Sequence, residues 1–276
     1  PLALLGAMII EVDRADDQRL DAFRWRERQL TTIAQRRNAV GEGHFIAEGD
    51  LVVERALAAG CVPEHVLCDP KTATRFADLI ATAGGVTLVA SADIRREVTG
   101  LGVPLDAIGV FRRPSVRSLS DVVAKSTRLV ILDGIDNPSN VGSIVRSAAA
   151  LGWDGLLLDT TSSDPLARRA LRVAMGTTFA LPHARYGSPT ELLEALTARS
   201  FEIVGLTPTH ATRLVVDVAE IPATGNPRAL VLGSERSGLS AQMADACTHL
   251  ARIPMREGID SLNVAIAAGI ACYALR

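Results

Sequence analysis

Three loops in the second half of the chain place polar side chains where they could do chemistry. The first contains Asn140 and Arg146, with Gly142 between them. Ser139 or Asn140 is expected to cap the helix that follows, and Gly142 and Arg146 share one face of it. Free N–H groups at a helix start attract anions, and a guanidinium adds a two-pronged phosphate ligand. The loop therefore predicts an anion site, although a capped helix with a surface arginine is the simpler interpretation of this loop alone.

The second loop is a turn with GxExxG spacing over residues 233–238, directly after the apolar run 229–232. Backbone N–H groups exposed in such a turn could hold a carboxylate or the edge of an adenine. The spacing is not the GxGxxG dinucleotide fingerprint, and no acidic residue follows at the distance that ribose recognition requires. The loop therefore disfavours a Rossmann-type cofactor, while an ordinary strand–turn–helix connection stays open.

The third loop leads into the last helix, which is predicted over residues 261–275. Ser261 is its expected N-cap, and Asn263 then lies in the first turn. An amide in an otherwise apolar helix needs a hydrogen-bond partner, which could be structural or a ligand. Alanine, glycine and isoleucine occur on every side of this helix, which predicts that both of its faces are buried.

The elements that must position these loops alternate between strand and helix along the second half of the chain. The predicted strands are continuous apolar runs, as expected for buried parallel strands, and ligands gather at the carboxyl ends of such strands. All three loops lie at those ends. Strands are predicted at residues 129–132, 155–158, 201–206, 229–232 and 250–253, with a short extended segment at 179–182. Helices are predicted at residues 141–150, 165–175, 189–199, 239–246 and 261–275.

The first half of the chain alternates helices and strands at shorter spacing, which predicts a compact α/β domain of three layers. Residues 13–37 predict one or two surface helices, and the polar, proline-containing stretch 112–118 marks a junction. The predicted organisation is a first domain at residues 1–115 with a helical N-terminal extension, a linker at 116–124 and a second domain at 125–276.

The composition limits how the chain could bind nucleic acid. The 276 residues are 48% apolar with a net charge of −2, which indicates a globular protein rather than a disordered chain. Proteins that hold nucleic acid by phosphate neutralisation are usually basic, so RNA binding would depend on local arginines. A solvated basic surface is the competing interpretation of each cluster. The candidates are Arg36, Arg37, Arg112, Arg113, Arg168 and Arg172.

The cysteines and the N-terminal end set further bounds. The four cysteines form no CxxC pair and no zinc-ligand spacing with histidine, so we expect buried free thiols and no metal site. The apolar residues 1–10 are too short to span a bilayer, and we expect a cytoplasmic protein with no membrane partner. Because the chain starts at Pro1, we expect a trimmed end, with Met8 as a candidate natural start.

Taken together and in this order, the three loops resemble the motifs of the SpoU (TrmH) branch of the SPOUT RNA 2′-O-methyltransferases. Residues 164–176 are similar to the middle segment of this family, and residues 37–54 more distantly resemble its L30e-like substrate-binding domain. The chain is most similar to 23S ribosomal RNA methyltransferases, some of which confer antibiotic resistance. The motif segments are residues 140–146, 233–238, 253–255 and 261–264.

The resemblance implies an enzyme that transfers a methyl group from S-adenosylmethionine to a ribose 2′-hydroxyl in structured RNA, with 23S rRNA as the expected target. It implies an α/β architecture in which an L30e-like RNA-binding domain precedes a trefoil-knot domain with a parallel sheet. It also implies a homodimer whose active site uses both subunits, with Arg172 reaching the substrate from the partner. Residues implied in catalysis are Asn140, Arg146, Glu235, Ser261 and Asn263. Residues implied in cofactor binding are Thr207, Leu232, Gly233, Ser234, Ile253, Ser261 and Leu262.

The role of Arg146 needs a physical interpretation. The family often assigns this arginine as the base, but a guanidinium keeps its proton at any ordinary pH. We therefore expect Arg146 to anchor the target phosphate and to stabilise developing alkoxide charge. The proton acceptor would be a phosphate oxygen, water or Glu235.

Three alternatives stay open. The chain could be a transfer RNA 2′-O-methyltransferase, a catalytically inactive ribosome-associated RNA-binding protein, or a doubly wound nucleotide- or NAD-binding enzyme. An inactive protein would have lost motif residues, yet all of those named above are present. The missing glycine fingerprint argues against the NAD-binding enzyme.

Overall fold

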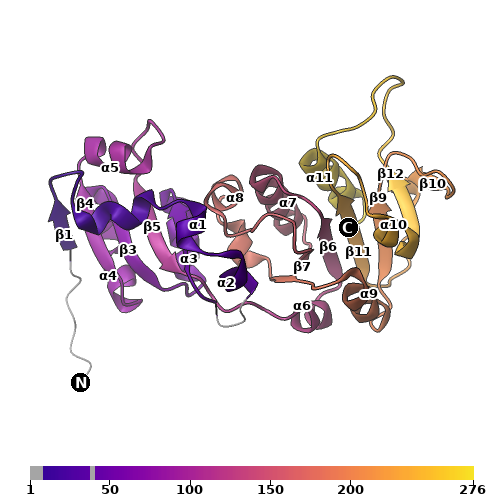
Figure 1. Cartoon of the computed structure of the whole chain (residues 1–276), viewed down its shortest axis with the longest axis horizontal. Helices are drawn as coiled ribbons and strands as arrows, with labels where there is room; N and C mark the ends of the chain where they lie inside the picture. The colour runs from indigo at the N-terminus through magenta and orange to yellow at the C-terminus, as the bar shows by residue number, and fades with distance from the viewer. Residues whose placement is uncertain (1–8, 38–40) are drawn as a thin grey trace. The chain divides into compact units, whose positions relative to one another are not determined.

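The computed structural model describes residues 9–37 and 41–276, and the chain forms two compact units (Figure 1). The first unit comprises Pro1–Val116 together with Leu166–Phe179, and the second comprises Arg117–Pro165 and Ala180–Arg276. The first unit thus includes an excursion from the second half of the chain, which the sequence-based domain boundaries do not contain.

A helix occupies most of the stretch predicted to be a linker. The structure forms α6 (Leu119–Lys125) there, and the Ser118 hydroxyl caps it by accepting a 3.0 Å hydrogen bond from the backbone N–H of Asp121. Val122 and Val123 are buried in the core of the second unit. The linker prediction is therefore wrong for these residues, because their apolar side chains belong to a hydrophobic core.

The sheet of the first unit is mixed and has five strands in the order β1-β4-β3-β5-β2. Parallel pairing joins β1 to β4 and β4 to β3, whereas β5 runs antiparallel to both β3 and β2. The strands are β1 (Ile9–Val12), β2 (His44–Glu48), β3 (Pro63–Cys68), β4 (Val86–Ala90) and β5 (Ala107–Arg112).

Each face of this sheet carries its own core, which gives the three predicted layers. On β2, Phe45 packs in one apolar cluster and its neighbour Ile46 in the other, since successive side chains of a strand point to opposite faces. Helices α3 (Asp50–Ala58) and α4 (Pro70–Thr82) cover the first face. The other is covered by the 3-10 helix η1 (Gln18–Arg24) and by α5 (Ala92–Thr99), and α1 (Glu27–Leu30) and α2 (Ile33–Arg37) complete the unit.

The excursion Leu166–Phe179 is tied to the first unit by a buried ion-pair cluster. It contains α8 (Arg168–Val173), which is shorter than the predicted helix 165–175 because Met175 and the next residue adopt positive φ and end it. Arg168 and Arg172 both donate to the carboxylate of the buried Glu48, with 2.7 Å between Arg172 Nη1 and Glu48 Oε2. Leu171 also packs in a core cluster of the first unit, so this placement depends on residues far away in the sequence.

The sheet of the second unit is entirely parallel, in the order β10-β12-β9-β11-β6-β7-β8. Its central strands are the predicted apolar runs. Residues 179 and 180 are not extended, because they end the 3-10 helix η2 (Thr177–Ala180) that precedes β8. The short β10 is not among the predicted strands, although it overlaps the apolar run 214–216. The strands are β6 (Arg128–Asp133), β7 (Gly155–Leu158), β8 (His183–Arg185), β9 (Glu202–Leu206), β10 (Val215–Asp217), β11 (Arg228–Gly233) and β12 (His249–Arg252).

Helices cover both faces of the parallel sheet. On one face α6, α9 (Pro189–Thr197) and α10 (Ala241–Ala246) enclose a core with inward side chains such as Ile131 and Val231. On the other, α7 (Pro138–Ala150) and α11 (Val264–Ala274) pack against each other (Figure 1). The short 3-10 helix η3 (Val218–Glu220) follows β10.

The last helix departs from its prediction. One face of α11 packs against α7, but the side chains of Ile266 and Tyr273 are 57% and 59% exposed, and Ile270 is exposed as well. The expectation of two buried faces is therefore wrong within one chain.

The cysteines match their prediction. Cys61, Cys68, Cys247 and Cys272 are all buried free thiols. Over the described ranges, no helix has the length and apolar character needed to cross a bilayer.

Candidate active site

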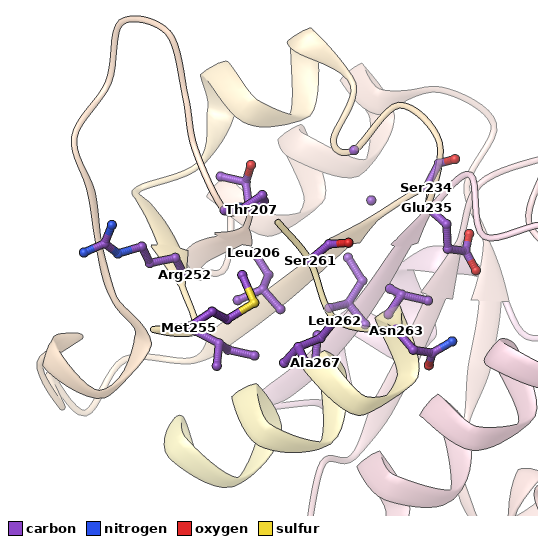
Figure 2. A pocket seen from close by; sticks show the side chains of 16 residues that line it. Leu206, Thr207, Ser234, Glu235, Arg252, Met255, Ser261, Leu262, Asn263 and Ala267 are labelled. Carbon is purple, nitrogen blue, oxygen red and sulfur yellow. The ribbon is translucent and has the colours of Figure 1, made fainter. Parts of the chain in front are cut away.

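A cavity of about 500 Å³ opens in the second unit at the carboxyl ends of β9, β11 and β12, beside the start of α11 (Figure 2). Parallel sheets concentrate binding sites at this edge. All seven residues that the resemblance assigns to cofactor binding line it. The lining residues are Leu206, Thr207, Pro208, Leu232, Gly233, Ser234, Glu235, Gly238, Arg252, Ile253, Met255, Ser261, Leu262, Asn263, Val264 and Ala267.

The turn after β11 can form only with glycine at its first position. A Cβ atom built on Gly233 would lie 2.3 Å from the carbonyl carbon of Gly238, because the turn folds back on itself. The backbone N–H of Gly238 donates a 2.8 Å hydrogen bond to the carbonyl of Ser234, and Gly238 has a φ of 69°. The turn is thereby fixed, and it carries Glu235, which lines the cavity.

The end of β6 anchors the segment that follows this turn. The carboxylate of Asp133 accepts a 2.7 Å hydrogen bond from the backbone N–H of Ser240, which in turn caps α10. Tyr186 lies buried beneath the same edge and donates to the carbonyl of Leu132 at 3.2 Å. Burial, reinforced by the carboxylates of Asp133 and Asp159, raises the pKa of Tyr186 far above its usual value, so this phenol stays protonated.

The N-caps of α7 and α11 differ from those predicted. Asn137, not Ser139 or Asn140, caps α7: its side-chain oxygen accepts from the backbone N–H of Ser139 at 2.9 Å. At α11 the cap is Asn263 rather than Ser261, which remains in the loop that lines the cavity. Serine and asparagine are both favourable caps, so sequence alone does not distinguish these positions.

Asn140 is thereby free for another role. It lies inside α7 and is only 8% exposed, so its amide needs partners. Asn263 Nδ2 donates to Asn140 Oδ1 at 3.1 Å, and Asn140 Nδ2 donates to Glu235 Oε1. Three residues from three separate segments of the chain thus form one hydrogen-bonded chain at the edge of the cavity.

The structure brings together four of the five residues predicted to be catalytic. Glu235, Ser261 and Asn263 line the cavity, and Asn140 bonds two of them. Arg146 lies two turns further along α7, is exposed and is not among the lining residues. Within the described residues, no salt bridge or side-chain hydrogen bond involves Arg146.

The predicted RNA-binding arginines fall in different environments. Arg112 ends β5 in the first unit, is 66% exposed and pairs with Glu64 at 3.3 Å, and Arg113 follows it. Arg168 and Arg172 are held by Glu48, as described above. The side chains of Arg36 and Arg37, at the end of α2, lie outside the part of the chain that is described.

Sequence reasoning did not assign Arg252 to the cavity wall, and it gave Met255 no role although this residue ends the motif segment 253–255. Met255, which follows β12, presents a thioether to the cavity, and Arg252 lies beside it (Figure 2). Arg252 Nε donates to Asp217 of β10 at 2.8 Å. The signal for Met255 was available, since it follows a predicted strand. The pairing of Arg252 depends on β10, which overlaps an apolar run of only three residues, 214–216, and is not among the predicted strands.

The cysteines contribute no nucleophile. Burial raises the pKa of Cys61 to about 11 and, as the leading cause, those of Cys68, Cys247 and Cys272 to about 12. A thiol needs its thiolate form to react, so none of these groups is activated at neutral pH.

Proteins of similar sequence agree with this description of the site. Residues 127–273 match the SpoU rRNA Methylase family. A relative described as an uncharacterized tRNA/rRNA methyltransferase of Mycobacterium tuberculosis is 36% identical over 97% of this chain and 92% of its own. The 23S rRNA (guanosine(2553)-2′-O)-methyltransferase RlmP of Bacillus subtilis is 28% identical over 84% of this chain and 88% of its own.

Solved structures agree along the whole chain. The AdoMet-bound rRNA methyltransferase from Sinorhizobium meliloti covers 97% of each chain with a TM-score of 0.81 and 27% identity. The SpoU methyltransferase AviRb from Streptomyces viridochromogenes, also in complex with AdoMet, has a TM-score of 0.76 and 25% identity, covering 94% of this chain and 97% of its own.

Fold, site and relatives define an RNA-modifying methyltransferase with a parallel α/β catalytic unit. The chain belongs to the SpoU rRNA methylase family. The resemblance seen in the three loops is thereby confirmed.

Proposed function

We propose that this enzyme transfers the methyl group of S-adenosylmethionine to the 2′-hydroxyl of one ribose in 23S ribosomal RNA. The observation that carries the proposal is the convergence of Asn140, Glu235 and Asn263 at the rim of a cavity lined by every residue expected to bind the cofactor. The specificity of the Bacillus subtilis relative for a ribose 2′-oxygen of 23S rRNA supports the same reaction.

The cavity fits S-adenosylmethionine. Its volume of about 500 Å³ lies in the range of small-molecule sites, and it combines apolar walls with exposed backbone groups. The backbone of Leu232, Gly233, Ile253 and Leu262 would hold the cofactor with Ser234 and Ser261, and Thr207 would lie near its edge. Gly233 packs directly against the backbone of Gly238, where no side chain would fit, so the shape of this wall depends on glycine. Bound there, the cofactor supplies an electrophilic methyl group on a sulfonium.

The residues at the cavity rim position the hydroxyl. Holding two reacting groups in line removes much of the entropic barrier, which is the main task of such a site. Arg146, exposed and without an ion-pair partner in the described part of the chain, would bind the target phosphate and stabilise negative charge on the ribose oxygen. Asn140, Glu235, Ser261 and Asn263 would surround the ribose.

The first unit would bind the RNA, in an L30e-like manner. Arg112 and Arg113 at the end of β5 would contact the RNA backbone, and Arg36 and Arg37 are further candidates from the sequence. Arg168 and Arg172 are secondary candidates, because the buried carboxylate of Glu48 holds both side chains in place, although it offsets only one of their two positive charges. Sequence recognition in RNA favours unpaired bases, so a loop in the rRNA is the expected target.

The catalytic unit would act as a homodimer with a trefoil knot. The exposed apolar side chains of Ile266, Ile270 and Tyr273 on α11 need cover, and a second copy would supply the buried environment predicted from the sequence. The knot is an exception to the rule that chains do not thread loops, and its support is family membership.

Mapping ribose methylation tests the proposal. Total RNA from a strain that lacks the gene, compared with its parent, should lose one 2′-O-methyl group in 23S rRNA and regain it with a plasmid copy. The names of several relatives cover both tRNA and rRNA, so the same map must include transfer RNA. Loss of a methyl group from transfer RNA instead would make transfer RNA the substrate in place of 23S rRNA. An unchanged methylation map would contradict the proposed reaction.

A further inference from the structure

The hydrogen bonds at the rim of the cavity have a fixed direction. The backbone N–H groups of Ala265 and Ile266 donate to Asn263 Oδ1 at 2.9 and 3.4 Å. A backbone N–H can only donate, so it fixes which end of the Asn263 amide is oxygen. Asn263 Nδ2 must then point away from the helix, where it donates to Asn140 Oδ1 at 3.1 Å.

The direction of the hydrogen bond to Glu235 follows in the same way. Because Asn140 Oδ1 accepts from Asn263, the opposite end of the Asn140 amide is a donor, and it meets Glu235 Oε1. Glu235 Oε1 is thus an acceptor. The start of α11 therefore determines, through two amides, both the rotamer and the hydrogen-bonding state of this carboxylate. No described residue donates to the second oxygen, Oε2.

We propose that Glu235 Oε2 accepts the proton of the ribose 2′-hydroxyl, and that Asn140 and Asn263 are positioning residues that aim it. This assignment rests on the proposed methyl transfer. Glu235 lines the cavity and lies on the same side of the view as Asn263, whereas Arg252 and Met255 lie on the other (Figure 2). Without the amide chain, an exposed glutamate on a turn would sample many rotamers.

The proton balance is complete. As the ribose oxygen forms its bond to the methyl carbon, the carbon–sulfur bond breaks and its electron pair stays on sulfur. The hydroxyl proton moves to Glu235 Oε2, which leaves a neutral carboxylic acid that then loses its proton to solvent. Arg146 does not exchange a proton in this scheme; it neutralises charge, as a guanidinium can.

Few charged side chains lie around the cavity besides that of Glu235. Arg236 follows it on the same turn, and α7 carries Arg146. Across the cavity, Arg252 pairs with Asp217. The α11 residues that line the cavity are uncharged. Glu235 is thus the one carboxylate among the described lining residues, which makes it separable by mutation.

Glu235→Gln tests the proton acceptor. Glutamine keeps an oxygen that accepts from Asn140 but cannot take up a proton. The expected single-turnover rate, with undermethylated rRNA and saturating S-adenosylmethionine, is lower by about 10²–10⁴-fold. The pH–rate profile of the wild-type enzyme should fall at acid pH, and the profile of the Glu235→Gln variant should lack this acid limb. Calorimetry should give a Kd for S-adenosylmethionine within about threefold of wild type. Asp245→Asn, which removes an exposed carboxylate on α10, is the matched control.

Two further variants separate the positioning of Glu235 from the stability of the fold. Asn263→Asp still caps α11 but cannot donate to Asn140, so the rate should fall by about tenfold or more while Tm changes little. Asn140→Asp places a second carboxylate beside Glu235, and like charges at hydrogen-bond distance disfavour joint ionisation. The acid limb of its pH–rate profile should therefore move to higher pH, with partial recovery of rate in alkaline buffer.

The outcomes are distinguishable. A Glu235→Gln enzyme within threefold of wild-type rate, or one that retains the acid limb, would overturn the assignment while leaving methyl transfer intact. An Asn263→Asp enzyme of normal rate would overturn the aiming role. Wild-type protein that binds S-adenosylmethionine but methylates no RNA would overturn the proposed function and this inference together.

Discussion

Asn263 at the start of α11 donates a 3.1 Å hydrogen bond to Asn140 of α7, although the two residues are 123 positions apart in the chain. This bond joins the first and third polar loops of the sequence, and Asn140 extends it to Glu235 in the second. The three loops therefore form a single site, rather than three independent helix caps and turns.

Replacing Asn140 with alanine should slow methyl transfer without preventing the cofactor from binding. The change leaves the amide of Asn263 and the carboxylate of Glu235 without their shared partner, at a stability cost of about 1–3 kcal/mol. Methyl transfer should fall by about 10²-fold or more, with an almost unchanged Kd for S-adenosylmethionine. Thermal unfolding, calorimetry and single-turnover rates measure the three quantities. Gln242→Ala on α10 is a polar control, and equal effects at both positions would contradict the role given to Asn140.

Gly233→Ala should weaken cofactor binding. The new methyl group would lie 2.3 Å from the backbone of Gly238, so the turn must open and the cavity wall must move. The Kd for S-adenosylmethionine should rise by about tenfold or more, accompanied by a lower Tm. Gly238→Ala is the informative comparison: its φ of 69° brings strain, but no atom lies within 4 Å of the added carbon. A larger loss at Gly238 than at Gly233 would show that close packing is not the constraint.

Arg146→Lys tests the guanidinium. A lysine keeps the positive charge but cannot copy the planar fork that binds a phosphate through two N–H groups. We expect most of the turnover to be lost, with binding of S-adenosylmethionine unaffected because Arg146 is not part of the cavity wall. Steady-state kinetics with rRNA and calorimetry with the cofactor provide the test. Near wild-type turnover in the lysine variant would refute the anchoring role.

The exposed face of α11 should control assembly. Ile270→Asp places a charge among the apolar side chains that we assign to the dimer contact, and it should yield monomers in light scattering. Because the active site is expected to use both subunits, activity should fall in parallel. Leu79→Asp on α4, where the leucine is 54% exposed, should leave the oligomeric state unchanged. A wild-type protein that is already monomeric at working concentration would contradict the proposed dimer.

Local patterns predicted the site well because its geometry follows from strand order. The apolar runs of β6 and β11 and the polar loops after them could be recognised directly, and parallel pairing brings their carboxyl ends together. Cap positions could not be fixed, since Ser261 and Asn263 are both good caps and only tertiary contacts select one. The position of α8 could not be predicted either, because it depends on contacts with residues far away in the sequence, such as Glu48, some 120 residues away.

The most direct test of the account is the chemical position of the transferred methyl group. Purified protein would be incubated with undermethylated ribosomal RNA and S-adenosylmethionine carrying a labelled methyl group, and the RNA would then be digested and analysed by mass spectrometry. We predict one labelled nucleoside in 23S rRNA, with the label on the ribose 2′-oxygen. Label on a base, or no label in RNA despite tight cofactor binding, would contradict it.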